Sequence, residues 1–445
     1  MSQYEILVLG AGAAGLAAAR MLAEAGKRVA IIEARDRIGG RIFTDRVTAR
    51  NSVAPVSIEL GAEFIHGLPQ VTWDLLKEAY IRTYELDGEQ LSFAHGGFQS
   101  SGEDPLGATH VIEEMMAWLA TQPRGTDETF SQYLERARMD GSLRKRATAY
   151  VEGFNAADSH VIGVAALAKQ QLAENEIRAD RLFHVEAGYD AFAKFLSDRF
   201  LAAGGTLLLQ HPAHDIRWSQ NAVAISGTDA RGHEFELHAD RAIVTLPLGV
   251  LHAGAVVFDP KPQEIFFNAA RMAMGPVIRI SLLFDAKFWQ EDLSFLFAPD
   301  ETPSTWWTPM PKSVPLITGW AGGPRAAALA QRIDARADPK ALLDESLSVL
   351  SRVYGVAARE LQARLVSWHT HDWQADPYAR GAYSYAPAGA LNASRNMTQP
   401  VANTLYFAGE HTDTTGHWGT VHGALGSGLR AATQILGAKT PPASA

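Results

Sequence analysis

The sequence predicts an α/β protein of two domains, one of which is built on a parallel sheet. The chain has 445 residues, more than a single hydrophobic core usually serves. Residues 5–33 show a strand, a glycine-rich turn, a helix and a second strand in succession, which is the pattern of a βαβ unit. Amphipathic helices follow between residues 104 and 176, and strand-like segments return between residues 206 and 258.

Local signals predict the individual elements. Residues 6–9 (ILVL) form a continuous apolar run, typical of a strand that is buried on both faces. A helix of small and apolar residues ends at Gly26, and residues 28–32 form the next strand. Near the other end of the chain, Asp338 is expected to cap a helix that ends at Gly355.

The glycines of the βαβ unit predict a dinucleotide-binding turn. Gly10 allows the tight turn, Gly12 lets the backbone approach a pyrophosphate, and Gly15 lets the helix pack against the sheet. The first amides of that helix are free to bind phosphate oxygens. Glu33, after the second strand, can accept hydrogen bonds from ribose hydroxyls and would repel a 2′-phosphate. The expected ligand is therefore NAD or FAD rather than NADP.

Composition excludes several classes of function. Lys and Arg number 40 and Asp and Glu 49, a net charge of −9 that provides no basic footprint for nucleic acid. The absence of cysteine excludes disulfides, thiol nucleophiles and cysteine-ligated metals, so any redox chemistry must be carried by a bound group. The N-terminus lacks the features of a secretory signal, and the longest uncharged stretch, residues 242–258, is too short for a bilayer span. We expect a soluble, cytoplasmic protein that does not enter a membrane.

A metal site is also not expected. His411, His417 and His422 are separated by steps of six and five residues, which match no common ligand spacing, and no cysteine accompanies them.

Motifs along nearly the whole chain carry a resemblance to one family. They are residues 33–41 (EARDRIGGR), 59–67 (ELGAEFIHG), 188–192 (GYDAF), 246–251 (LPLGVL), 373–383 (WQADPYARGAY), 405–412 (LYFAGEHT) and 419–424 (GTVHGA). With these motifs the chain resembles the flavin-dependent amine oxidases, which include monoamine oxidases, polyamine oxidases, L-amino-acid oxidases and lysine-specific histone demethylases.

The resemblance implies a discontinuous architecture. A Rossmann-type FAD-binding domain would combine residues 1–70, 185–260 and 370–438. An α+β substrate-binding domain would combine residues 71–184 and 261–369, with the active site between the two domains. Residues 439–445 are expected to form a flexible tail.

The resemblance also implies which residues contact FAD. Arg35 and Arg41 would lie near the adenosine and the pyrophosphate, and Glu410 near the ribityl or pyrophosphate part. Thr420 and Val421 would open the last helix, with their N–H groups toward the flavin N1/O2 edge. The other expected contacts are Gly10, Gly12, Ala14, Gly15, Glu33, Ala34, Gly39, Gly40, Gly61, Ala62, Glu63, Ala213, Trp373 and Gly409. Ala382 stands where monoamine oxidases place the cysteine that holds flavin, so FAD should be non-covalent.

Catalytic expectations come from the same resemblance. Tyr383 matches one wall of an aromatic cage that orients the substrate amine. Thr420 replaces the second wall, so the cage is open on that side unless Trp418 or His417 leans in. Trp373 would lie alongside the flavin. His66 is expected either to face the substrate or to be a hydrogen-bonded structural histidine.

Arg279 departs from the family pattern. It occupies the position of a lysine that hydrogen-bonds through water to flavin N5, and arginine effectively cannot lose its proton. This departure argues against proton relay and fast oxygen activation. If Arg279 faces the substrate, it could instead clamp an α-carboxylate. Three tryptophans, Trp306, Trp307 and Trp320, are expected either to line a substrate channel or to lie in the core.

The implied reaction is oxidation of a small-molecule amine, namely a polyamine, a monoamine or an amino acid. Hydride passes to flavin N5, the imine hydrolyses to an aldehyde or ketone, and O2 reoxidises the flavin with formation of H2O2. A dehydrogenase or desaturase with another acceptor, or a catalytically silent flavoprotein that binds a partner, remain alternatives. The protein would be a monomer or a homodimer.

Overall fold

A five-stranded parallel sheet contains the predicted βαβ unit in the computed structural model, which describes residues 4–48, 55–100, 108–333 and 338–437. Its strands, in spatial order, are β10 (Thr206–Leu208), β2 (Val29–Ile32), β1 (Ile6–Leu9), β14 (Arg241–Val244) and β23 (Leu405–Phe407). The prediction for β1 is confirmed to the residue, and β2 begins one residue later than expected.

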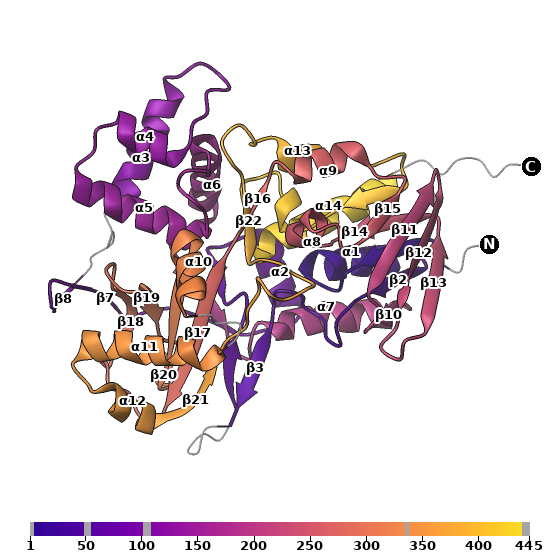
Figure 1. The fold of residues 1–445 in the computed structure, drawn as a ribbon. Coiled ribbons are helices and arrows are strands. Elements are labelled where there is room, and N and C mark those ends of the chain that lie inside the picture. The colour runs from indigo at the N-terminus through magenta and orange to yellow at the C-terminus, as the bar shows by residue number, and fades with distance from the viewer. Residues whose placement is uncertain (1–3, 49–54, 101–107, 334–337, 438–445) are drawn as a thin grey trace, which may run out of the picture.

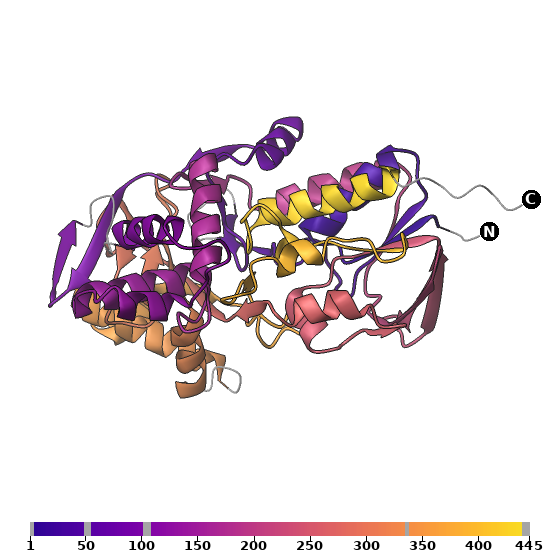
Figure 2. The same cartoon turned by 90° about the horizontal axis from the view of Figure 1, so that it is seen from above.

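The continuous apolar run in β1 reflects two different cores. Ile6 and Val8 pack into a cluster with helices on one face of the sheet, whereas Leu7 and Leu9 pack into a cluster on the other face. The first face is covered by α1 (Ala13–Glu24), α7 (Asp190–Ala202) and α14 (Val421–Gly437), which lie side by side in Figures 1 and 2, with α2 (Gln70–Glu78) against α14. The second face carries a mixed sheet and three helices. In the sheet β13 (Glu234–Ala239), β12 (Ala222–Thr228) and β11 (Ala213–Ser219) are antiparallel neighbours, and β15 (Val257–Asp259) runs parallel to β11. The helices are α8 (Leu248–His252), α9 (Gln263–Ala269) and α13 (Ala393–Asn396).

A mixed seven-stranded sheet forms the other half of the molecule (Figure 1). In spatial order it contains β21 (Leu365–His369), β17 (Val277–Phe284), β20 (Leu316–Gly322), β19 (Thr305–Trp307), β18 (Leu293–Phe297), β7 (Glu89–Ala94) and β8 (Gly97–Ser100). Helices α10 (Gly323–Arg332), α11 (Pro339–Tyr354) and α12 (Ala358–Arg364) share its core. The ends of α11 are as predicted, since Asp338 Oδ1 accepts from the Lys340 amide at 2.9 Å and Gly355 has φ of 69°.

The predicted helical region forms a bundle beside this sheet. It consists of α3 (Ala108–Ala120), α4 (Phe130–Arg136), α5 (Gly141–Asn155) and α6 (Val164–Ile177), which share one apolar cluster. The first residues of the predicted region, 104–107, lie outside the described residues.

Three small sheets complete the fold. They are β3 (Thr44–Val47) with β4 (Val56–Glu59), β16 (Ala273–Gly275) with β22 (Tyr383–Tyr385), and β5 (Phe64–His66) with β9 (Leu182–Val185) and β6 (Thr83–Glu85), and a short 3-10 helix spans Glu410–Thr412. The β5–β9–β6 sheet joins segments assigned to different predicted domains. The domain boundaries stay predictions, and the predicted tail, residues 439–445, lies outside the described residues. Among the helices of the described chain, none has the length and apolar character needed to cross a bilayer.

Candidate functional site

A cavity of about 1040 Å³ gathers almost all of the predicted site residues. It is bounded by the turn after β1, the end of β2, strand β17 and the N-terminus of α14. The predicted residues that line it are Gly10, Gly12, Ala14, Glu33, Ala34, Arg35, Gly39, Gly40, Arg41, Gly61, Ala62, Glu63, His66, Ala213, Arg279, Trp373, Tyr383, Gly409, Glu410, Thr420 and Val421. Gly15 is the exception, because it packs behind the turn. Single ligand pockets usually enclose about 300–1,000 Å³, so this cavity is large enough for a dinucleotide with a small second ligand.

The backbone requires glycine at two of the three glycine positions of the turn, and the reason differs between those two. Gly10 has φ of 101°, a conformation that side chains disfavour. A Cβ on Gly15 would lie 2.0 Å from the Gly10 carbonyl oxygen, so this glycine allows helix and turn to touch. Gly12 has φ of −76°, which any residue adopts, and a Cβ there would meet only the Gly39 carbonyl oxygen, at 4.0 Å. The fold therefore does not require glycine at position 12, whereas a ligand close to the backbone would.

Glu33 ties the end of β2 to this turn. Its carboxylate accepts from the Ala11 amide at 2.7 Å and from the Arg35 amide at 2.9 Å, and the residue is 4% exposed. Arg35 donates to Asp376 at 2.6 Å, so its guanidinium is held beside the cavity wall. Both carboxylate oxygens of Glu33 thus lie at the end of β2, where an acidic residue that recognises ribose is expected.

Glu410 and Arg41 form a second charged pair on the cavity wall. Arg41 Nη1 donates to Glu410 Oε1 at 2.9 Å and to the Ala382 carbonyl at 2.7 Å. The other carboxylate oxygen of Glu410 accepts from the Ser384 hydroxyl and the Gly419 amide. Although burial opposes ionisation, the Arg41 guanidinium holds the pKa of Glu410 below its usual value. The ionised carboxylate of Glu410 thus holds the Arg41 guanidinium at the cavity wall.

The last helix begins at Val421, as predicted, with its N-terminus on the cavity. The Thr420 hydroxyl accepts from the Gly423 amide at 3.0 Å and donates to the His417 carbonyl at 2.7 Å. Thr420 is therefore the N-cap, and the first amides of α14 provide a partial positive charge at this wall.

Arg279 occupies the buried strand β17 and contacts the loop that follows β4. Its Nη2 donates to Glu63 Oε2 at 2.6 Å and its Nη1 to the Gly61 carbonyl at 2.9 Å. Glu63 also accepts from Trp307 Nε1 at 3.0 Å. Sequence reasoning identified Arg279 and Glu63 separately but missed that they pair, because 216 residues separate them in the chain.

Aromatic rings line the cavity around Tyr383. The ring of Trp320 lies nearly parallel to it, with centroids 6.5 Å apart and an interplanar angle of 15°. Both side chains bond to the end of α5, Tyr383 to the Phe154 carbonyl and Trp320 to the Gly153 carbonyl. Trp418 also lines the cavity, but its indole N–H is held by Ser394 Oγ at 2.8 Å. Trp320 of β20, rather than Trp418, thus provides the ring that lies parallel to Tyr383.

The remaining aromatic predictions divide between wall and core. Trp307 lines the cavity beside Trp320, whereas Trp306 is 0% exposed and belongs to the core of the seven-stranded sheet. Trp373 lines the cavity and donates from Nε1 to the Leu60 carbonyl at 2.8 Å.

Two histidines on the cavity wall are held neutral by burial. Burial lowers the pKa of His66 to about 4, and it also lowers the pKa of His422. The His422 ring lies 4.5 Å from that of His417, and Nε2 of His422 has no hydrogen-bond partner. Neither imidazole therefore adds a positive charge to this wall. Within the described residues no group of three or more His, Cys, Asp or Glu side chains could hold a metal ion.

Sequence reasoning missed the part of the cavity that lies between α5 and α6. This part is lined by Tyr150, Phe154, Asn155, Gln170 and Glu174 among others. A signal was present, because Gln170 and Glu174 follow Leu167 at i+3 and i+7 on one helical face. Two polar residues that continue a buried face were therefore candidates for the wall of a cavity.

Comparisons with known proteins agree with this geometry. A family model described as flavin containing amine oxidoreductase matches residues 13–436. The chain is 27% identical over 471 residues to lysine-specific histone demethylase 1 homolog 2 of Arabidopsis thaliana, an alignment that covers 98% of this chain and 59% of the relative. It is also 27% identical over 463 residues to polyamine oxidase 4 of Oryza sativa subsp. japonica, covering 97% of this chain and 88% of the relative. The chain therefore spans little more than half the length of the demethylase homologue.

Solved structures share the fold. A triple mutant of putrescine oxidase superimposes with a TM-score of 0.81 at 21% identity, covering 97% of this chain and 98% of that chain. Cyclohexylamine oxidase from Brevibacterium oxydans superimposes with a TM-score of 0.77 at 20% identity, again covering 97% and 98%. At these identities the likeness concerns the α/β architecture.

Proposed function

The chain belongs to the family of flavin-containing amine oxidoreductases, and from this premise we propose that it oxidises an amine with FAD bound non-covalently. The observation that carries the proposal is the cavity in which the dinucleotide turn, Arg279 and Tyr383 meet. The substrate would occupy the part of the cavity beside Tyr383.

The residues of the cavity fit FAD. The turn at Gly12 and the N-terminus of α1 would hold the pyrophosphate, and Glu33 the adenosine ribose. The N-terminus of α14 would face the pyrimidine edge of the flavin. With alanine at position 382 and no cysteine in the chain, nothing can tether FAD through sulfur. Bound FAD supplies the acceptor for a hydride from the α-carbon of the amine.

The residues of the cavity would orient the substrate amine and keep water away from it. The rings of Tyr383 and Trp320 present parallel faces that would orient the amine nitrogen and exclude water. Neutral His66 and His422 place no competing cation at this wall. Because hydride leaves most readily from a neutral amine, this environment favours the reactive form of the substrate.

The environment of Arg279 bears on whether O2 or a different electron acceptor reoxidises the flavin. Arg279 is ion-paired with Glu63 and cannot lose its proton, so it offers no proton relay for the reduction of oxygen. This pair favours slow reaction with O2 and makes a dehydrogenase the second candidate.

The proposed function is tested by mixing the purified protein with amines in the absence of oxygen. Polyamines, monoamines and L-amino acids are added singly while the flavin absorbance is followed, and oxygen is then admitted. Bleaching by an amine class is the expected result. Rapid return of colour with peroxide identifies an oxidase, and bleaching without return identifies a dehydrogenase. Protein whose flavin no amine bleaches would disprove amine oxidation, and flavin that stays with the protein after denaturation would disprove non-covalent binding.

A further inference from the structure

The cations on the cavity wall are nearly all held by carboxylates of the protein itself. Within the part of the chain that the structure describes, four arginines and no lysine line the cavity. Three of them have a carboxylate partner at 2.6 to 2.9 Å, in the pairs Arg35–Asp376, Arg41–Glu410 and Arg279–Glu63. The fourth, Arg380, is exposed and its backbone packs against α8. A substrate that carried a carboxylate would need one of these guanidinium groups as its counter-ion.

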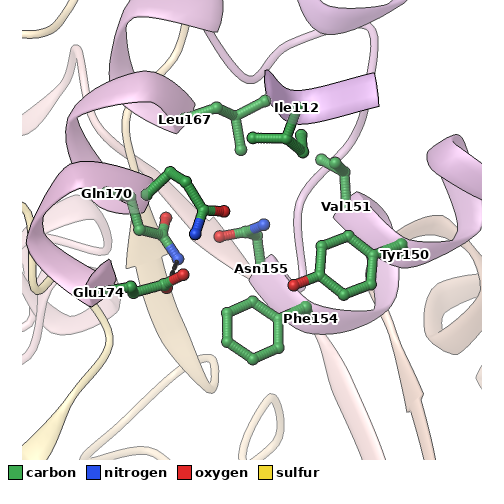
Figure 3. A pocket seen from close by; sticks show the side chains of 9 residues that line it. Ile112, Tyr150, Val151, Phe154, Asn155, Leu167, Gln170 and Glu174 are labelled. Carbon is green, nitrogen blue, oxygen red and sulfur yellow. Dashed lines mark hydrogen bonds between the residues drawn. The ribbon is translucent and has the colours of Figure 1, made fainter. Parts of the chain in front are cut away.

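The part of the cavity between α5 and α6 offers no cation to a carboxylate. Figure 3 shows the side chains of Glu174, Gln170 and Asn155 facing a common space there. No Lys, Arg or His is found among the described residues that line it. Burial lowers the pKa of His66 and of His422 on the main wall, so neither carries a charge near neutral pH. Neither this part of the cavity nor these two histidines can therefore neutralise a substrate carboxylate.

Arg279 is the arginine that lies at the aromatic wall. It stands opposite Trp320 in the antiparallel pair of β17 and β20, so the two side chains project from the same face of the sheet. Its guanidinium carbon lies 5.6 Å from the centroid of the Trp307 ring. The Trp320 ring in turn lies parallel to that of Tyr383, beside which the amine is expected. This position suits a guanidinium that binds a carboxylate next to the reacting carbon.

Glu63 occupies the edge of the Arg279 guanidinium that would bind such a carboxylate. The Nε–H and Nη2–H groups of an arginine point to the same side and form a fork that holds a carboxylate with two hydrogen bonds. Here Nη2 donates to Glu63 Oε2 at 2.6 Å, whereas the buried Nε has no acceptor among the described residues. Trp307 Nε1 donates to the same Glu63 oxygen at 3.0 Å and fixes it in place. The fork is thus half-filled by an anion of the protein.

We propose that Glu63 determines the specificity of the site: by holding Arg279, it excludes amines that carry a carboxylate on the carbon to be oxidised. The inference rests on the proposed function, and from the amine classes named there it removes the L-amino acids. An amino acid that enters this site brings a second anion to one guanidinium, so one buried carboxylate is left without a counter-ion. The amine that lacks only this carboxylate adds no negative charge.

The first test measures carboxylate binding with 3-phenylpropanoate, a probe that has no amine to oxidise. Calorimetry on the oxidised holoenzyme gives its affinity. Glu63→Gln should bind the probe about 10- to 100-fold more tightly than the wild type, the range for a charge-assisted hydrogen bond. The double variant Arg279→Met with Glu63→Gln should lose this gain, because it has no guanidinium. Asp180→Asn, which removes an exposed carboxylate from the same cavity wall, is the control and should bind the probe as the wild type does.

A second test needs no variant. Three ligand pairs differ only by the α-carboxylate, namely pentylamine and L-norleucine, 2-phenylethylamine and L-phenylalanine, and 1,4-diaminobutane and L-ornithine. In the absence of oxygen, an amine that bleaches the flavin of the wild-type protein should do so at least about tenfold faster than its amino acid at equal concentration. An amino acid that bleaches the flavin as fast as its matched amine, or faster, would overturn the inference.

The outcomes separate the two proposals. Unchanged probe affinity in Glu63→Gln, an equal gain in Asp180→Asn, or a gain that persists without Arg279 would each overturn the inference. None of these results touches amine oxidation, which stands as long as an amine bleaches the flavin. If neither amines nor amino acids bleach it, the proposed function fails, whereas the calorimetry still reports whether Glu63 keeps carboxylates away from Arg279.

Discussion

The guanidinium of Arg279 and the carboxylate of Glu63 form an ion pair of 2.6 Å inside the protein, with side chains that are 4% and 10% exposed. The strand β17 supplies the cation and the loop after β4 supplies the anion. Because Arg279 also donates to the Gly61 carbonyl, the pair fixes the loop that lines the cavity. Its geometry has consequences for both stability and oxygen chemistry.

Removal of one member of this pair should destabilise the protein strongly. Arg279→Met leaves Glu63 as a buried, unpaired charge, for which we expect a loss of about 3–5 kcal/mol in the free energy of unfolding. Urea denaturation of the apoprotein measures this loss. The double variant Arg279→Met with Glu63→Gln should be clearly more stable than Arg279→Met alone. Additive losses in the double-mutant cycle would show that the two side chains do not interact.

Arg279→Lys should speed the reaction of the reduced protein with oxygen. A buried lysine can lose its proton, and a positioned proton-transfer group contributes about 10²- to 10⁴-fold to a rate. Stopped-flow mixing of the reduced holoenzyme with oxygenated buffer measures the reoxidation rate. Lys287→Arg, which alters a side chain paired with Glu291 after β17, should leave the rate unchanged. An unaltered rate in Arg279→Lys would show that Arg279 does not limit oxygen activation.

Gly12→Ala should impair FAD binding without impairing the fold. The new Cβ fits the backbone and meets protein only at 4.0 Å, but it faces the cavity where the pyrophosphate is expected. We expect FAD affinity to fall by about tenfold or more, equivalent to at least about 1.4 kcal/mol. Titration of the apoprotein with FAD and the melting temperature of the apoprotein distinguish the two effects. Gly141→Ala, at an open position of α5, is the control, and unchanged FAD affinity in Gly12→Ala would argue against this phosphate site.

His411 should make the folded state less stable in acid. Burial lowers its pKa to about 4 from the usual 6.5, so the unfolded chain binds the extra proton between these values. The free energy of unfolding should therefore fall as the pH drops from about 6.5 to about 4, by about 3 kcal/mol from this group. The difference between wild type and His411→Gln across that window, with FAD absent from both, isolates the contribution. Parallel stability curves would show that His411 titrates normally.

Much of the fold was predictable because its signals are local. The apolar run of β1 reports burial on both faces, and the ends of α11 are set by Asp338 and Gly355 within a few residues of the helix. Positions on the cavity wall were predictable where a motif fixes both identity and position, as at Gly12 and Glu410.

What escaped prediction depends on contacts between distant segments. The partner of Arg279 lies 216 residues away, and nothing in either segment specifies the pairing. The ring parallel to Tyr383 is that of Trp320 in β20, a strand far from Tyr383 in the sequence, whereas the indole N–H of Trp418 is bound by Ser394. Glu174 continues the face of α6 that holds Leu167, but the packing of α5 against that face, which the sequence does not specify, is what makes it line a cavity.

The β5–β9–β6 sheet limits how the protein can be divided. Phe64, Ile65 and His66 pair with residues 182–184 of β9, so a boundary after residue 184 cuts the strand that completes the ladder. A polypeptide assembled only from residues 1–70, 185–260 and 370–438 would present β5 as a bare edge, and bare edges recruit strands from other molecules. An isolated dinucleotide-binding half is thus expected to self-associate, and a fragment meant to stay monomeric should retain β9.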